Sequence, residues 1–203
     1  MSINLHDKKE KQELKIGILA VQGAFVEHKK AMEDLGVSCV LIRNKKDLDS
    51  IDGIILPGGE STVQGKLIRA LDMFSTIQNK INEGLPVLGT CAGLILLASH
   101  LETLPVSVKR NAYGRQLGSF VTNENVGNIK DYPMVFIRAP YITETKNDAV
   151  EILSIVDKNI VGVKFGNQIG LSFHPEMTDD LRIHKEFLNI VEEYSSIKQD
   201  ASA

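Results

Sequence analysis

One cysteine of this sequence, Cys91, lies between two glycines in the pentapeptide Gly89–Gly93 (GTCAG), and this setting favours a nucleophile. The apolar run Pro86–Gly89 before it predicts a short buried strand, and Leu94–Leu101 after it predicts an apolar helix. A strand, a sharp turn and a helix form the nucleophile elbow of hydrolases, in which glycines permit a turn that exposes one side chain. At a helix N-terminus the helix dipole and the free N–H groups favour the thiolate, which is the reactive form. Taken alone, the pentapeptide also fits a buried cysteine between two turn glycines.

A histidine and a glutamate two residues apart follow the predicted strand Ile169–Phe173, in the segment Ser172–Glu176 (SFHPE). The carboxyl ends of parallel strands gather the functional loops of a sheet at one edge. His174 is therefore expected to face Cys91, and Glu176 to hold the imidazole by a hydrogen bond and stabilise its charged form. By itself, His174 fits a capping or packing role before the final helix. Together with the elbow, the pattern predicts a Cys91–His174–Glu176 triad.

A third predicted strand ends in the segment Leu56–Thr62 (LPGGEST). Its two adjacent glycines let the backbone approach a ligand closely and point N–H groups at it. Those N–H groups, that of Gly59 among them, are predicted to form an oxyanion hole with the N–H of Ala92. The alternative is a plain turn in which Ser61 or Thr62 caps the next helix, and the two interpretations are compatible.

The other four histidines carry a weaker signal. His6, His100 and His184 are expected to be solvated or to pack, whereas His28, which follows the turn Gln22-Gly23, stays undecided. No cluster of His, Cys, Asp and Glu has the spacing of a metal site, and no Walker-type phosphate loop occurs in the sequence. We therefore expect neither a metal nor a cofactor.

The elements that must position these residues alternate between strand and helix over the first half of the chain. Short loops link them, which implies right-handed crossovers and a doubly wound, mostly parallel sheet flanked by helices. The second half carries strand-like runs separated by turns, which predicts antiparallel additions to that sheet. The expected fold class is α/β and flavodoxin-like. The predicted strands are Leu14–Val21, Val37–Arg43, Gly53–Leu56, Pro86–Gly89, Ser107–Lys109, Ser119–Asn123, Met134–Ile137, Glu151–Val156, Ile160–Lys164 and Ile169–Phe173, and the predicted helices are Phe25–Leu35, Thr62–Asn82 with an interruption near Asp72, Leu94–Leu101 and Asp180–Tyr194.

Length, charge and cysteine content limit the kinds of protein that fit. The 203 residues suffice for one domain with a real core, and the net charge of −3 gives no electrostatic reason to expect nucleic acid or an anionic membrane. No apolar run approaches the roughly 20 residues of a membrane-spanning helix, and the polar start lacks the apolar core of a secretory signal. Two cysteines in unlike surroundings do not suggest a disulfide framework, so a cytoplasmic location is expected. Residues 1–14 are expected to be a disordered lead-in, 15–195 a single domain and 196–203 a C-terminal tail.

The segments PGGEST, GTCAGL and SFHPE together resemble the class I, triad-type glutamine amidotransferases. Longer motifs narrow the resemblance to the glutaminase subunits of pyridoxal 5′-phosphate synthase, which serve vitamin B6 synthesis. The resemblance extends from about Lys15 to Tyr194, with a stretch at 99–109 that is shorter than usual and with Tyr113 at the place of a usual Phe. The motifs are LAVQGAFVEH (Leu19–His28), LPGGEST (Leu56–Thr62), GTCAGLILLA (Gly89–Ala98), RNAYGRQ (Arg110–Gln116), FIRAP (Phe136–Pro140) and SFHPEMTDD (Ser172–Asp180).

The resemblance implies hydrolysis of L-glutamine to L-glutamate and ammonia through a cysteine thioester, with Cys91 as nucleophile, His174 as base and Glu176 as its partner. It also implies that a separate synthase subunit takes up the ammonia in a hetero-oligomeric complex, and that the region of Gln22 borders the oxyanion hole and takes part in activation at that interface. Glutamine has an α-carboxylate and an α-ammonium, which a guanidinium and a carboxylate or carbonyls recognise. The residues implied to hold glutamine are Gly59, Glu60, Ser61, Arg110, Ile137 and Arg138.

Three other functions compete with this interpretation. A glutaminase for another ammonia acceptor, such as imidazole glycerol phosphate synthesis, fits the triad but not the segments QGAF and FIRAP. A non-catalytic binding protein of the same fold has no need for Cys91, His174 and Glu176 together. A cysteine hydrolase of a related flavodoxin-like group would have a histidine directly after the cysteine, where this sequence has Ala92.

Overall fold

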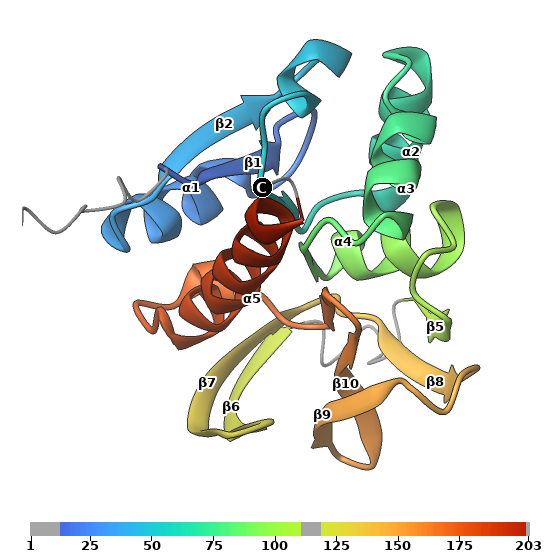
Figure 1. The fold of residues 1–203 in the computed structure, drawn as a ribbon. Coiled ribbons are helices and arrows are strands. Elements are labelled where there is room, and N and C mark those ends of the chain that lie inside the picture. The colour runs from blue at the N-terminus through green and yellow to red at the C-terminus, as the bar shows by residue number, and fades with distance from the viewer. Residues whose placement is uncertain (1–12, 111–118, 202–203) are drawn as a thin grey trace, which may run out of the picture.

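The computed structural model describes residues 13–110 and 119–201, which form an α/β fold (Figure 1). Their main sheet has nine strands in the order β2-β1-β3-β4-β11-β10-β8-β5, with β9 paired to β10. The first five strands in that order are parallel and the remaining pairs are antiparallel, so the predicted fold class is confirmed. The parallel strands are β1 (Lys15–Leu19), β2 (Ser38–Ile42), β3 (Gly53–Leu56), β4 (Val87–Thr90) and β11 (Gln168–Leu171), and the others are β5 (Val106–Lys109), β8 (Tyr141–Thr145), β9 (Glu151–Val156) and β10 (Asn159–Phe165).

The central strands are apolar on both faces because helices cover both faces of the sheet. In β3, Ile54 and Leu56 belong to one core, whereas Ile55 between them belongs to the other, as the two-residue period of a strand requires. Helices α2 (Ser61–Ala70) and α3 (Phe74–Asn82) cover the first core, and α1 (Phe25–Asp34) and α5 (Arg182–Asp200) cover the second (Figure 1). The carboxyl edge of the parallel strands is left for loops.

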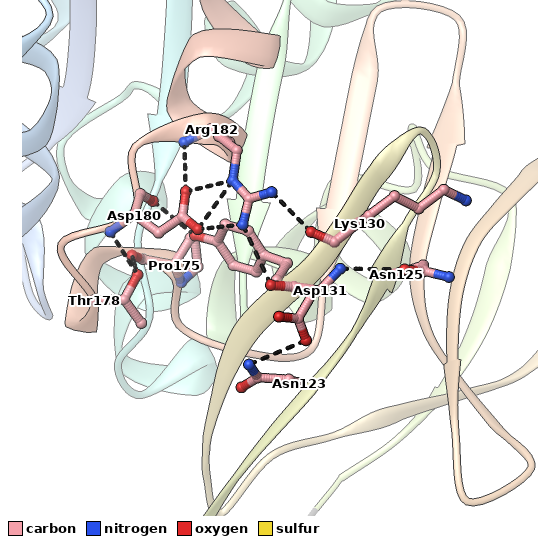
Figure 2. Close-up of polar contacts among 9 residues, drawn as sticks. Asn123, Asn125, Lys130, Asp131, Pro175, Thr178, Asp180 and Arg182 are labelled. Atoms are coloured by element: carbon pink, nitrogen blue, oxygen red, sulfur yellow. Dashed lines mark hydrogen bonds and ion pairs between the residues drawn. The ribbon is translucent and has the colours of Figure 1, made fainter.

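A separate hairpin of β6 (Ser119–Val126) and β7 (Ile129–Ile137) packs beside the sheet. Figure 2 shows how Arg182, at the start of α5, fastens it: the guanidinium donates hydrogen bonds to the carbonyls of Lys130 and Asp131 and to the carboxylate of Asp180. The side chain of Tyr132 also donates to the carbonyl of Asp180, at 3.0 Å. The hairpin is thereby held against the segment that leads from β11 to α5.

Several elements differ in extent from the prediction. The predicted helix Thr62–Asn82 is two helices, α2 and α3, separated where Asp72 takes a left-handed φ of 53°, so the predicted interruption is confirmed. β7 begins five residues before the predicted Met134, and Pro133 within it suits a two-stranded ribbon because its missing N–H faces no third strand there. Strand β8, whose sequence YITET is half polar, was missed.

The two remaining helices also have different limits. Because Cys91 precedes the first helical residue, α4 starts at Ala92; it ends at Ile95 and continues as a π-helical stretch, Leu96–His100. The last helix continues past Tyr194 to Asp200, into the stretch expected to be a tail, because the apolar period ends there while the helical hydrogen bonds do not. None of the helices in the described ranges is long and apolar enough to cross a membrane.

Candidate active site

Cys91 occupies the sharp turn between β4 and α4. Its backbone has φ 48° and ψ −98°, a strained conformation for a residue with a side chain, and its N–H donates to the carbonyl of Leu171 at 2.8 Å. The flanking glycines are required by space: a Cβ on Gly93 would lie 1.9 Å from the carbonyl oxygen of Leu56, and one on Gly89 would lie 2.9 Å from Gly93. The predicted strand–turn–helix arrangement is therefore present, and Cys91 is buried, with 8% of the residue exposed.

His174 and Glu176 lie beside this turn because their strand neighbours that of Cys91. β11 pairs with β4 in parallel, with Leu171 opposite Thr90, so both segments leave the same edge of the sheet. The His174 Nδ1 and Glu176 Oε1 atoms are 2.7 Å apart, and both side chains are buried. A short 3-10 turn, η3 (Pro175–Met177), folds the carboxylate back onto the imidazole.

The electrostatics of this group favour a charged imidazole. Burial by itself would lower the pKa of His174, but a hydrogen bond with the Cys91 thiol and the hydrogen bond and charge of Glu176 outweigh it and raise the pKa to about 10. Burial would likewise raise the pKa of Glu176, yet His28 and His174 hold it below its usual value. The buried Nε2 atom of His174 has no other hydrogen-bond partner among the described residues, so the Cys91 sulfur is the group with which it interacts.

A cavity of about 200 Å³ opens beside the thiol. It brings together the six residues implied by resemblance to hold glutamine, and it places them with Cys91 and Ala92. Two guanidiniums and one carboxylate give it charge: Arg138 lies 3.5 Å from Glu60 across an exposed contact, and Arg110 donates to Thr62 Oγ1 at 3.1 Å. Of the motif RNAYGRQ, 111–116 lie outside the described residues. The cavity is lined by Gly59, Glu60, Ser61, Cys91, Ala92, Ile95, Arg110, Ile137, Arg138 and Pro140.

Hydrogen bonds with residues 22–24, the segment before α1, hold the Gly58-Gly59 turn that follows β3. The Gly58 carbonyl accepts a hydrogen bond from the Ala24 N–H at 3.0 Å, so the N–H of the following trans peptide points away from α1. The Gln22 side-chain oxygen accepts from the Glu60 N–H at 2.8 Å. A Cβ on Gly58 would lie 2.3 Å from the His174 ring, so only glycine fits there. Gln22 is therefore built into the turn that borders the cavity.

Two histidines that sequence reasoning did not place at the site lie directly behind it. His28 is fully buried. Its Nε2 atom lies 3.3 Å from Glu176 Oε2 and 3.1 Å from Thr90 Oγ1, and its Nδ1 atom lies 3.0 Å from His184 Nε2. His184 is also fully buried, so of the two roles expected for it, packing is correct and solvation is wrong. The only available signal was the helical period of Phe25–Leu35, which turns His28 toward the sheet.

Similar solved structures define the class of protein. The crystal structure of a glutamine amidotransferase matches with a TM-score of 0.82 at 38% identity, over 87% of this chain and 98% of that one. The crystal structure of another glutamine amidotransferase, from Thermotoga maritima, matches with a TM-score of 0.61 at 16% identity, over 92% of this chain and 97% of that one, and shows the fold alone. The fold is that of the glutamine amidotransferases.

The chain belongs to the SNO glutamine amidotransferase family, whose sequence pattern matches residues 18–193. It is 57% identical over 192 residues to the pyridoxal 5′-phosphate synthase subunit PdxT of Desulfitobacterium hafniense strain Y51, covering 90% of this chain and 96% of that protein. It is 50% identical over 194 residues to the subunit of the same name from Streptococcus pneumoniae serotype 2 strain D39, covering 90% of this chain and all of that protein. The family predicted from the motifs is confirmed.

Proposed function

We propose that this protein is a glutaminase subunit that hydrolyses L-glutamine at Cys91 and delivers the ammonia to a separate synthase subunit for pyridoxal 5′-phosphate synthesis. The observation that carries the proposal is the triad beside a charged cavity: Cys91 in a strained turn, His174 on the neighbouring strand end, and Glu176 at 2.7 Å from the imidazole. Membership of the family and the names of relatives 50–58% identical support the same activity and the same acceptor.

In this proposal the thiolate of Cys91 attacks the side-chain amide carbon of glutamine. His174 gives its proton to the departing nitrogen, so the C–N bond breaks, ammonia leaves, and a γ-glutamyl thioester remains. The neutral imidazole then takes a proton from water, whose oxygen attacks the thioester and releases glutamate. The raised pKa of His174 fits the first step, because it keeps the proton donor charged at neutral pH. Glu176 orients the ring and stabilises its charge.

The cavity supplies groups for both charged ends of the substrate. Arg110 and Arg138 suit the α-carboxylate, and Glu60 suits the α-ammonium. The N–H groups of Gly59 and Ala92 are proposed to receive the negative oxygen that develops on the amide carbonyl. Ser61 and Ile137 complete the walls of the cavity.

Activation by the synthase is proposed to act through Gln22. Its side chain accepts the Glu60 N–H, and its carbonyl accepts a 2.9 Å hydrogen bond from Gln64, which also donates to the Pro57 carbonyl. A partner that displaces Gln22 would thus act on the Gly58–Gly59 peptide, whose orientation decides whether an N–H or a C=O faces the oxyanion. One well-aimed donor is worth about 10²–10³ in rate, enough for a switch. A reducing cytoplasm would keep the Cys91 thiol active.

Labelling of the chain with an electrophilic glutamine analogue tests the proposal, with the adduct mapped by mass spectrometry. We expect the label on Cys91 and competition by L-glutamine. Cys39 is an internal control, because its thiol is hardly ionised at neutral pH. Burial is the main cause that raises its pKa to about 11, and the charge of Glu33 adds to this effect. Labelling of Cys39 in preference to Cys91, or no label at Cys91 during turnover, would contradict the assignment.

A further inference from the structure

Behind the triad, a chain of buried polar groups connects Glu176 to two helices on the far side of the catalytic turn. Glu176 uses Oε1 for His174, whereas Oε2 is buried and has no well-formed hydrogen bond among the described residues. His28 Nε2, from the first turn of α1, lies 3.3 Å from Oε2. His28 Nδ1 in turn lies 3.0 Å from Nε2 of His184 on α5. Two segments 156 residues apart in the sequence meet here.

The proton positions in this chain follow from which atoms can only accept. An ionised carboxylate offers lone pairs alone, so Glu176 Oε2 requires that the Nε2 of His28 carry a hydrogen. Neutral His28 then has a bare Nδ1, which must accept from a Nε2–H of His184. In the reverse arrangement the Nε2 lone pair of His28 could accept from the Thr90 hydroxyl, 3.1 Å away, but it would also face a buried carboxylate. The Nδ1–H of His184 would then be buried without an acceptor among the described residues, and both features have a cost. Both imidazoles are therefore Nε2–H tautomers.

Burial keeps the two histidines in the neutral state that this arrangement needs. Burial is the main cause that lowers the pKa of His28. The charges of Glu176 and Glu27 oppose this lowering, and that of His174 adds to it. Burial is also the main cause that lowers the pKa of His184, to about 3. His28 adds to this lowering, and the charge of Glu176 opposes it. Glu27 lies on α1, Glu176 on η3 and His174 directly before η3. A neutral His28 aims a dipole at Glu176 and adds no second positive charge beside His174.

We propose that His28, fixed in its Nε2–H tautomer by His184, is a positioning residue that holds Glu176 ionised and aimed at His174. This inference rests on the proposed function, because it assigns a second support to the triad of that function. An N–H dipole that faces a carboxylate oxygen at 3.3 Å favours the charged form of the carboxyl group, and the carboxylate orients His174 only when it is ionised. The same Nε2 atom lies 3.1 Å from the hydroxyl of Thr90, the residue directly before Cys91, so its one N–H is shared between the carboxylate and that hydroxyl.

The test measures steady-state glutaminase activity against pH for the chain in complex with its synthase subunit, with L-glutamine as substrate. His28→Leu removes the donor, whereas His28→Gln places an amide nitrogen near the position of Nε2. We expect His28→Leu to lower kcat by roughly 10–100-fold, as loss of an outer-shell partner does around a metal ligand, with little change in KM. The acidic limb of its pH profile moves to higher pH, because Glu176 without its donor takes up a proton more easily. His28→Gln restores part of both.

A matched control separates positioning from general loss of packing. Thr103→Val breaks another buried side-chain hydrogen bond, 3.0 Å to Gln168, at the opposite end of the sheet and without a link to Glu176. This variant is expected to keep the wild-type kcat and acidic limb. If Thr103→Val matches His28→Leu, if His28→Leu keeps the wild-type profile, or if His28→Gln is no better than His28→Leu, the inference is overturned.

NMR of the wild-type chain labelled with ¹⁵N at histidine needs no variant and no turnover. Long-range proton–nitrogen correlations distinguish the two neutral tautomers, and we expect Nε2–H for both His28 and His184 at neutral pH. An Nδ1–H form of His28 would overturn the inference even if His28→Leu fails to fold. Failure of the proposed function is a different result, since wild-type protein with the synthase would then not hydrolyse glutamine at all.

Discussion

Cys39 lies within a strand of the main sheet and Cys91 directly follows one, and the two differ in almost every property that makes a thiol reactive. Cys39 lies within β2, at one edge of the sheet, and its thiol makes a 3.7 Å contact with the carbonyl of Val37. Burial raises its pKa to about 11, so at pH 7 about one thiol in 10⁴ is ionised. Cys91 follows the end of a central strand, in a strained turn, in contact with a histidine that is held by a carboxylate. We therefore expect the reactivity of each thiol to depend on its place relative to the strand end and on its partner.

Replacement of each cysteine by alanine gives the largest contrast. Cys91→Ala is expected to lower glutaminase activity by a factor on the order of 10⁶, as removal of a nucleophile does in a triad hydrolase. Cys39→Ala should keep the activity and cost about 1 kcal/mol of stability, because only a half-buried thiol is lost. Activity assays with the synthase and urea unfolding measure both. Residual turnover by Cys91→Ala at a tenth of the wild-type rate would remove the distinction between the two thiols.

The partners of Cys91 should rank in the order of their distance from the chemistry. His174→Ala is expected to remove nearly all activity, whereas Glu176→Gln should lose about 10⁴-fold and keep a measurable rate, because the carboxylate fixes the tautomer and charge of the base. Single-turnover rates with L-glutamine measure the difference. Wild-type rates in both variants would show that Cys91 works without a triad.

The rates at which iodoacetamide alkylates Cys91 and Cys39 should depend on pH in different ways. His174 carries its proton below its raised pKa of about 10, so an imidazolium faces the Cys91 sulfur from neutral pH up to that region. The rate at Cys39 should instead climb about tenfold per pH unit toward its pKa of about 11. At pH 7 we expect Cys91 to react on the order of 10²-fold faster or more. Parallel pH curves for the two thiols would contradict the role given to His174.

The charged wall of the cavity should show the smallest of these effects. Arg138→Gln is expected to raise KM for L-glutamine about tenfold with little change in kcat, because it removes one charge-assisted hydrogen bond from an exposed position. The matched control is Arg43→Gln, which should leave KM unchanged. Arg43 is exposed and directly follows β2, the strand that contains Cys39. An equal KM in both variants would remove Arg138 from the substrate contacts.

Most of this site could be predicted from sequence because its motifs follow strand ends. Parallel strands end at one edge, so Cys91 after β4 and His174 after β11 had to be neighbours once the strands were recognised. The position of His28 and His184 behind the site could not be predicted, because it depends on how α1 and α5 pack on one face of the sheet. Strand β8 was missed because its side chains are half polar and its pairing with β5 and β10 is long-range.

The most direct test of the account is the glutaminase rate of the purified chain, measured alone and during titration with the synthase subunit. The chain should be a poor glutaminase by itself. The rate should rise to a plateau as synthase is added, by about 10²-fold or more if one oxyanion donor is switched into place. Gln22→Ala should weaken this stimulation while Cys91 remains open to alkylation, since Gln22 touches the glycine turn and not the thiol. Full activity of the chain alone, unchanged by any amount of synthase, would contradict the account.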